Sequence, residues 1–261
     1  MFTHSFKADL RKIRFTGNPY AFIRLGDGER AICMGVAITP RTELWHYHGG
    51  DTAVSAAIKE LVYKHEPGIK LGISCSCCDR KAAIWYRKNV ATPAKDITFA
   101  NLFVNSNYRE FMSMIDRLGR NNYTLVACKS ADITVPENAL TDDYDPAETV
   151  KEMLLSTKPI LVAAGPVKCK LILDYWRLAK NKQIVVDIGS TLDPIIHGKE
   201  TRRYHSPDSP TASRVCTWLN PADYRLFGTN RLVMAARLRW ENSRTVRRYP
   251  AGSKISTRQS P

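Results

Sequence analysis

Short apolar runs alternate along this chain with segments whose apolar residues recur at helical spacing. The runs end at glycine, proline or polar residues, as buried strands do, and they cover about residues 20–25, 69–75, 98–104, 123–128, 158–164 and 183–188. Helical spacing covers residues 3–14, 30–36, 51–64, 79–88, 109–118, 145–155 and 168–178. The alternation predicts an α/β fold: a three-layer α/β/α, Rossmann-like domain with a mostly parallel sheet.

The first run ends abruptly in a turn rich in glycine and acid, Gly26-Asp27-Gly28-Glu29. Ligands of open α/β sheets bind outside the carboxyl ends of the strands, so Asp27 and Glu29 could hold a divalent cation against a diphosphate. The competing interpretation is a turn whose Asp27 caps the following helix. The spacing leaves both open, because Ala31 interrupts the dinucleotide fingerprint G-x-G-x-x-G.

A second turn of this kind follows the run at residues 158–164. Gly165-Pro166 leads into a helix with Lys168 at its start, where free backbone N–H groups and a lysine could bind a phosphate or a ribose. Proline at position 166 removes one donor but suits a first helical turn. The next strand ends in Asp187, at the same edge of the predicted sheet.

Taken together, Arg-x-Gly-Asp-Gly-Glu at 24–29, Ile-Leu-Val-Ala-x-Gly-Pro at 160–166 and Val-Asp-Ile-Gly at 186–189 resemble the GT-D-type glycosyltransferases of bacteria and phages. An aromatic-Asn-aromatic stretch of that family is similar to residues 99–108, and the resemblance covers roughly residues 10–198. The chain departs from the family pattern after Gly189, where the family often has His and this chain has Ser190-Thr191-Leu192-Asp193.

The resemblance implies a Rossmann-like enzyme that binds a nucleoside-diphosphate sugar, with a UDP-sugar favoured, and carries a D-x-E motif. Asp27 and Glu29 would then be catalytic residues and ligands of Mn²⁺ or Mg²⁺. The position of Asp187 at a strand end makes it our candidate for a third catalytic residue, which activates the acceptor hydroxyl or positions the donor. The residues expected to bind the nucleotide-sugar are Arg24, Gly26, Gly28, Asn105, Tyr108, Gly165, Pro166 and Lys168. An ordinary loop and helix cap is the alternative for Asn105 and Tyr108.

Charge is concentrated at the carboxyl-terminal end. The chain has a formal net charge of +14, and residues 199–261 hold 13 Lys and Arg against 4 Asp and Glu, which is +9. We therefore expect a catalytic domain at 1–198 and a basic extension at 199–261, beginning with a turn-rich linker at 204–210 and ending in about ten disordered residues.

The basic extension favours an anionic partner. Arg237, Arg239, Arg247 and Arg248 are the expected nucleic-acid contacts, and a solvated basic face is the alternative. The acceptor we expect is 5-hydroxymethylpyrimidine in DNA, as in phages that glycosylate their genomes. A protein or glycan acceptor, or a non-catalytic nucleic-acid-binding protein on the same fold, remains an alternative.

Other features argue against a secreted, a membrane-spanning or a zinc-binding protein. The seven cysteines form no regular framework, which favours a reduced, cytoplasmic protein, and no apolar run is long enough to span a membrane. The resemblance to phage enzymes extends this expectation to a phage-encoded protein that acts in the host cytoplasm. Cys75-x-Cys77-Cys78 lacks a matching second pair for zinc, so buried thiols at a strand end are expected. His46 and His48 lack a third ligand nearby, and the acids around Asp145 fit a helix cap better than a metal site.

Overall fold

The computed structural model describes residues 19–39, 45–75, 78–137, 139–140, 144–206, 208–209 and 211. Several predictions therefore lie outside the described residues. They are the amphipathic helix at 3–14, Cys77, and the basic segment that contains Arg237, Arg239, Arg247 and Arg248.

The described strands form one seven-stranded sheet in the order β3-β2-β1-β7-β6-β4-β5, and every pairing between them is parallel. The α/β fold class predicted from the alternation is confirmed. The strands are β1 (Tyr20–Leu25), β2 (Ile69–Ile73), β3 (Ile97–Phe99), β4 (Thr124–Ala127), β5 (Ile133–Thr134), β6 (Ile160–Ala163) and β7 (Ile184–Asp187).

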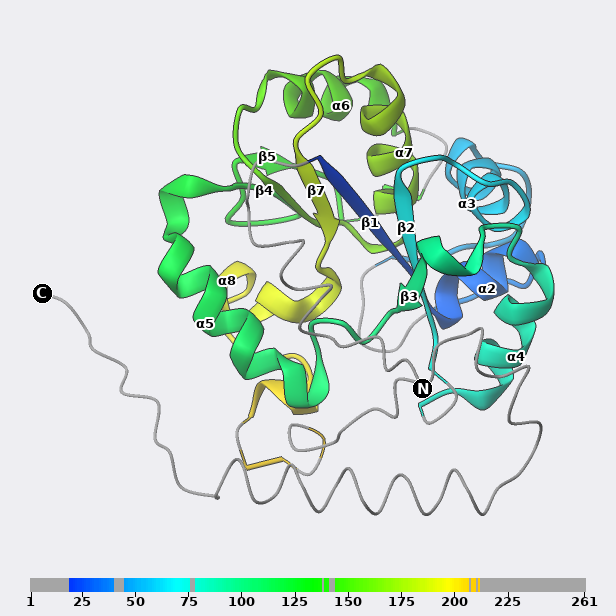
Figure 1. Ribbon diagram of the computed structural model, residues 1–261, viewed down its shortest axis with the longest axis horizontal. Helices are drawn as coiled ribbons and strands as arrows, with labels where there is room; N and C mark the ends of the chain where they lie inside the picture. The colour runs from blue at the N-terminus through cyan, green and yellow to red at the C-terminus, as the bar shows by residue number, and fades with distance from the viewer. Residues whose placement is uncertain are drawn as a thin grey trace, which may run out of the picture.

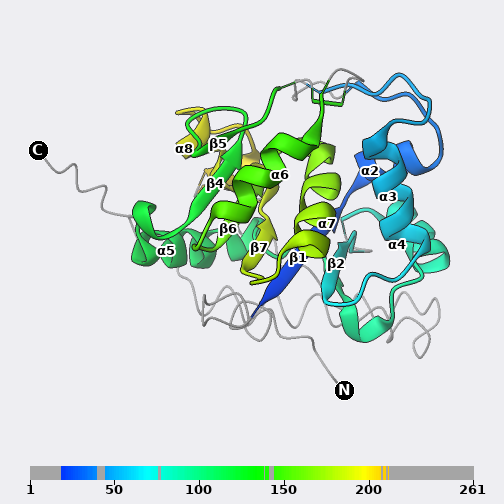
Figure 2. The same ribbon diagram turned by 90° about the horizontal axis from the view of Figure 1, so that it is seen from above.

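Helices cover both faces of this sheet (Figures 1 and 2). One apolar core joins one side of the central strands to helices on the first face, and a second core, which includes Phe22, Phe103 and Phe111, joins the other side to α5 and α8. The predicted three layers are therefore present. The first face carries α2 (Asp27–Cys33), α3 (Ala53–Tyr63), α4 (Arg80–Asn89), α6 (Pro146–Leu155) and α7 (Lys168–Leu178), and the second carries α5 (Tyr108–Leu118) and α8 (Asp193–Ile196).

The central strands are buried on both faces, which explains their continuous apolar runs. The edge strands departed from prediction. The strand predicted at residues 98–104 is present but much shorter, since β3 ends at Phe99 and the apolar residues that follow, Leu102 and Phe103, pack into the second core. The two-residue β5 was missed because a strand so short has no detectable periodicity.

Helix starts follow local capping chemistry. The predicted cap of α6 is confirmed, because the Asp145 carboxylate accepts a hydrogen bond from the Ala147 N–H at 2.9 Å, with Pro146 in the first turn. The first turn of α3 is capped by Thr52, and the neighbouring Asp51 pairs with Lys59. The start predicted for α2, at residue 30, was wrong: the helix begins at Asp27.

Residues after 198 contribute to this domain. Tyr204 and His205 are buried and their rings pack against Tyr108 on α5, with centroids 5.4 and 5.2 Å apart. The interpretation of this segment as a turn-rich linker was wrong at these residues, because aromatic packing fixes them against the domain.

Within the part of the chain that the structure describes, no helix has both the length and the apolar character needed to cross a membrane.

Candidate functional site

A cavity of about 1120 Å³ opens at the carboxyl edge of the sheet. Its floor lies where β1 meets β7, the point at which the chain's strand order turns from one side of the sheet to the other. In open α/β sheets such a switch point leaves a crevice between the diverging connections, where ligands bind. The volume is large enough for a nucleotide-sized ligand.

The Gly-Asp-Gly-Glu turn is the start of α2. Gly26 is the N-cap, and the Glu29 carboxylate reaches back to accept the Gly26 N–H through Oε2 at 2.7 Å. The Tyr86 hydroxyl donates to the Gly26 carbonyl at 2.5 Å. An acid three residues into a helix is well placed to satisfy the free N–H of the cap, so Glu29, and not Asp27, supplies the capping contact.

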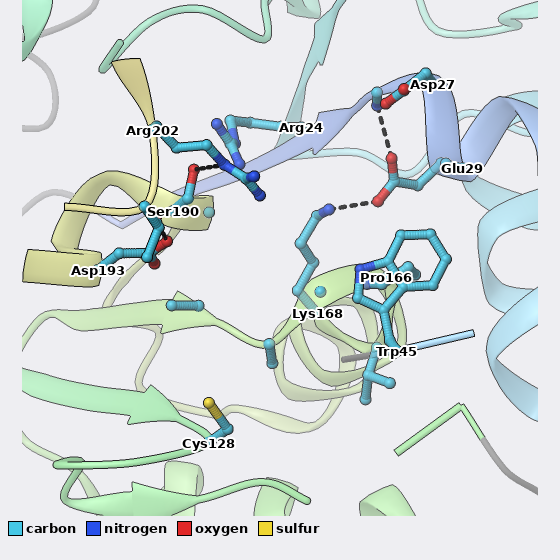
Figure 3. Close-up of a pocket in the computed structure, with 18 of the residues that line it drawn as sticks. Arg24, Asp27, Glu29, Trp45, Cys128, Pro166, Lys168, Ser190, Asp193 and Arg202 are labelled. Atoms are coloured by element: carbon cyan, nitrogen blue, oxygen red, sulfur yellow. Dashed lines mark hydrogen bonds and ion pairs between the residues drawn. The ribbon is translucent and has the colours of Figure 1, made fainter. Parts of the chain in front are cut away.

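Below this turn, four charged side chains, three of them buried and Arg24 partly so, form a network across β1, α2, α7 and β7. The Lys168 ammonium lies 2.5 Å from Glu29 Oε1 and 3.5 Å from Asp187 Oδ2 (Figure 3 shows the first pair). The Arg24 guanidinium approaches Asp187 through Nε at 3.4 Å. We call Arg24, Glu29, Lys168 and Asp187 the ionic layer; two cations and two anions make it formally neutral.

The contacts within the ionic layer favour the charged forms of Glu29 and Lys168. Burial alone would raise the pKa of Glu29, but the Lys168 ammonium and the hydrogen bonds to Glu29 outweigh burial and lower that pKa. Burial would likewise lower the pKa of Lys168, yet the carboxylates of Asp187 and Glu29 raise it. A buried charge is tolerated only when it is paired and hydrogen-bonded, and here each has a partner.

Asp187 organises the layer from beneath. It is fully buried, and its carboxylate accepts the backbone N–H groups of Arg24 at 2.9 Å and Gly189 at 2.8 Å as well as facing Lys168. Asp187 does not line the cavity, whereas the residues predicted at the two glycine turns, which follow β1 and β6, do line it. A carboxylate with these contacts holds β1, β7 and Lys168 in place and does not face the cavity, so acceptor activation and donor positioning, its two predicted roles, both stay predictions without a direct contact in this geometry.

The two acids predicted to hold a metal differ in availability. Glu29 has both oxygens engaged, one by Lys168 and one by Gly26, whereas Asp27 is exposed on the cavity wall. The described residues contain no group of three or more His, Cys, Asp and Glu side chains able to hold a metal ion. Asp27 therefore fits a Mg²⁺-like ion bound mainly by water and substrate phosphates, as Mg²⁺ commonly is.

The two glycine turns share one neighbour, Trp45, which no local sequence pattern singles out. The indole of Trp45 lies against both: a Cβ on Gly28 would stand 2.9 Å from the ring, and one on Gly165 would stand 3.1 Å from it. Trp45 lines the cavity next to Pro166 (Figure 3). Glycine at both positions thus admits a flat aromatic surface beside the predicted phosphate turns.

The opposite wall comes from the segment after β7. Ser190, Asp193 and Arg202 face the cavity across from Asp27 and Glu29 (Figure 3). Sequence reasoning did not select these three as site residues. The available signal was position, since Ser190 and Asp193 directly follow a strand that ends in an acid.

Two residues predicted to bind the donor, Asn105 and Tyr108, are not among those that line the cavity. Asn105 is buried, with a positive φ of 57°, and neither it nor Tyr108 lines the cavity. Asn101, four residues earlier, does line it and donates to the Cys78 sulfur at 3.1 Å. Asn105 and Tyr108 as direct sugar contacts therefore stay a prediction that this geometry does not favour.

The cysteines and the histidine pair show no metal-binding arrangement in the described residues. Cys75 is buried, as expected of a thiol at a strand end, but Cys78 is exposed, so that expectation was wrong for Cys78. The rings of His46 and His48 lie 4.6 Å apart, and His48 is exposed.

Comparison with known proteins adds one structural similarity. No protein-family model and no curated protein sequence matches the chain. A solved structure described as "The highly conserved domain of unknown function 1792 has a distinct glycosyltransferase fold" is similar to it, with 15% sequence identity and a TM-score of 0.42, over 80% of this chain and 84% of that chain. At that identity and TM-score the similarity establishes neither family nor activity, so the site is interpreted from its own residues.

Proposed function

We propose that this protein is a glycosyltransferase that moves a sugar from a nucleoside-diphosphate sugar, with a UDP-sugar favoured, to a hydroxyl acceptor. The observation that carries the proposal is the ionic layer at the floor of the cavity, between two glycine turns at the carboxyl ends of β1 and β6. Cations fixed beside open backbone turns suit a diphosphate leaving group, because charge that develops there meets prearranged partners.

Each residue of the floor has a task in this reaction. Arg24 and Lys168 face the leaving diphosphate, Glu29 and Asp187 hold them in place, and Gly26, Gly28 and Gly165 let the backbone come close to the phosphates. Asp27 would hold Mn²⁺ or Mg²⁺, which supplies further charge neutralisation to the diphosphate when bound. Trp45 offers a flat surface on which a nucleobase or sugar can stack.

The test is donor hydrolysis. Purified protein with a panel of UDP-sugars and Mn²⁺ should release UDP slowly, and Glu29→Ala should lower the rate about 100-fold, because Lys168 loses its anchor. Glu148→Ala on the exposed face of α6 is the matched control and should leave the rate unchanged. Since Glu29 is buried, Glu29→Gln serves as a second, isosteric variant, with circular dichroism to confirm folding. Full turnover in a folded Glu29 variant would refute the site assignment.

For the acceptor we propose 5-hydroxymethylpyrimidine in DNA. The support is the charge of +9 within residues 199–261, because a duplex must have phosphates neutralised before its bases are approached. Mass spectrometry of nucleosides from hydroxymethylated DNA, treated with protein and the donor panel, should reveal a hexose or pentose adduct. Modification of a glycan or peptide acceptor instead would favour the alternative transferase.

The same basic charge supports a second candidate, a nucleic-acid-binding protein without catalysis. DNA binding combined with no UDP release from any common sugar nucleotide would favour it over the transferase.

A further inference from the structure

The cavity has a second wall whose chemistry the donor site does not use. It is built by the turn after β7 and by residues 201–205, and we call Ser190, Asp193 and Arg202 the β7 wall. Figure 3 shows these three residues on one side of the cavity, with Asp27, Glu29 and Trp45 on the other. A donor bound at the floor would therefore lie between the glycine turns and the β7 wall.

The β7 wall is held rigidly. The Ser190 and Tyr204 hydroxyls are 2.7 Å apart, and Arg202 Nε donates to Ser190 Oγ at 3.3 Å. His205 Nδ1 accepts the backbone N–H groups of Thr201 and Arg202 at 3.2 and 3.3 Å, which leaves its Nε2–H to donate to the Ser190 carbonyl at 2.9 Å. These contacts fix the residues of the wall before any ligand arrives, as a reacting site requires.

Asp193 is the acid that the β7 wall presents. It is 9% exposed and lines the cavity, and the one side-chain hydrogen bond recorded for it in the described residues comes from Thr201 Oγ1 to Oδ2. Among the described residues, no side-chain or backbone donor occupies its Oδ1. Asp187, by contrast, is fully buried beneath the floor and receives two backbone N–H groups.

The surroundings of Asp193 suit proton transfer. Burial raises the pKa of Asp193 above the usual aspartate value, while the hydrogen bond from Thr201 opposes that rise. A carboxylate with a raised pKa is a stronger base than an ordinary aspartate. The titratable and charged groups that face it are His197, Arg202, His205, Tyr204, Tyr108 and Cys128.

We propose that the β7 wall is the acceptor subsite and that Asp193 is the base that takes the proton from the acceptor hydroxyl. This inference rests on the proposed glycosyltransferase function. As the acceptor oxygen bonds to the anomeric carbon, the bond from that carbon to the diphosphate oxygen breaks and its electron pair leaves with the nucleoside diphosphate. The hydroxyl proton passes to Asp193, and Arg24 and Lys168 face the negative charge that leaves.

The experiment uses the full chain, with water as acceptor and UDP-glucose and UDP-galactose as donors. Asp193→Asn should lower UDP release about 100-fold, the lower range for loss of a general base, with the affinity for UDP by calorimetry unchanged. Asp174→Asn is the matched control, because Asp174 is a partly buried acid paired with Lys170 on α7, outside the cavity. It should behave as the wild-type protein does.

Thr201→Val tests the base without removing it. Loss of a hydrogen bond to the ionised carboxylate raises the pKa of Asp193 further. Because the base must be deprotonated, release falls as pH drops through that pKa, and the acidic limb of the rate profile should move to higher pH in Thr201→Val. A purely structural role for Asp193 would not move this limb.

The outcomes separate the two proposals. Unchanged UDP release by Asp193→Asn overturns the inference, and so does a parallel loss of UDP affinity, which would indicate a structural role. An acidic limb that stays in place in Thr201→Val also overturns it. Each of these results, obtained while the wild-type protein releases UDP, overturns the inference alone, whereas wild-type protein that neither binds UDP nor releases it refutes the proposed function, and the inference falls with it.

Discussion

Four charged side chains from four different elements meet in the ionic layer, with Glu29 and Lys168 139 residues apart in sequence. Both are nearly excluded from solvent, with side chains 6% and 7% exposed. Coulomb attraction is strong in such surroundings, but so is the cost of removing either charge from water. The layer is thus a specific arrangement whose partners depend on each other.

Lys168→Met tests this dependence. Asp187 keeps Arg24 as a partner, so the carboxylate left unpaired and buried is that of Glu29, and the free energy of unfolding should fall by about 3–5 kcal/mol. Urea denaturation measures the change. Lys170→Met breaks the more exposed pair with Asp174 and should cost only about 0–1 kcal/mol. Equal losses in the two variants would contradict a special role for the layer, and Glu29→Gln added to Lys168→Met should restore part of the stability.

At the scale of elements, the turn that follows β7 positions the Arg24 side chain. Gly189 has a φ of +51°, and a Cβ on it would stand 1.4 Å from Arg24 Nη2. Arg24 comes from the neighbouring strand β1, so the missing side chain at residue 189 is what lets the guanidinium lie along the floor of the cavity. The turn and the strand therefore fit together only with glycine at this position.

Gly189→Ala should consequently displace Arg24 and weaken UDP binding about tenfold or more, since a hydrogen bond to a charged group contributes about 1.5–3 kcal/mol. Calorimetric titration with UDP measures the loss. Gly35→Ala is the control: φ is +68° there too, but a Cβ would meet no atom within 4 Å, so only the backbone cost of about 1–2 kcal/mol is expected. If both variants bind UDP as the wild type does, Arg24 is not part of the phosphate site.

At the scale of the whole molecule, charge is distributed unevenly along the chain. Residues 199–261 hold +9 of the net +14. The segment with Arg237, Arg239, Arg247 and Arg248 lies outside the described residues, so its role is argued from charge alone. Counterion release makes the affinity for DNA fall with salt in proportion to the phosphates contacted.

Replacing these four arginines together by alanine should reduce the slope of log affinity against log salt by roughly 3 to 4, at about 0.9 per lost phosphate contact. Fluorescence anisotropy with a hydroxymethylated duplex over a salt series gives the slope. The control replaces four exposed lysines of the described domain, Lys81, Lys88, Lys95 and Lys180, which removes the same charge. A slope that falls equally in both variants would show that net charge alone acts, without a dedicated contact surface.

The sequence by itself determined the fold class and the edge of the sheet at which the site lies. Strands buried on both faces need continuous apolar runs, and helices packed on one face need apolar residues at helical spacing, so both are visible locally. The glycine turns at 26–28 and 165 were visible for the same reason, because a strand that ends in glycine is a local signal. The cap at Asp145 likewise depends only on neighbouring residues.

Only the tertiary structure decided what each polar group of the site contacts. Three such contacts depend on the order in which the strands join the sheet. They are the pairing of Glu29 with Lys168, the place of Asp187 beneath the floor, and the packing of Trp45 against both glycine turns. The same holds for Tyr204, which packs on Tyr108 instead of lying in a linker. Contacts between residues far apart in sequence arise from strand order and register, and no local pattern of apolar and polar residues encodes them.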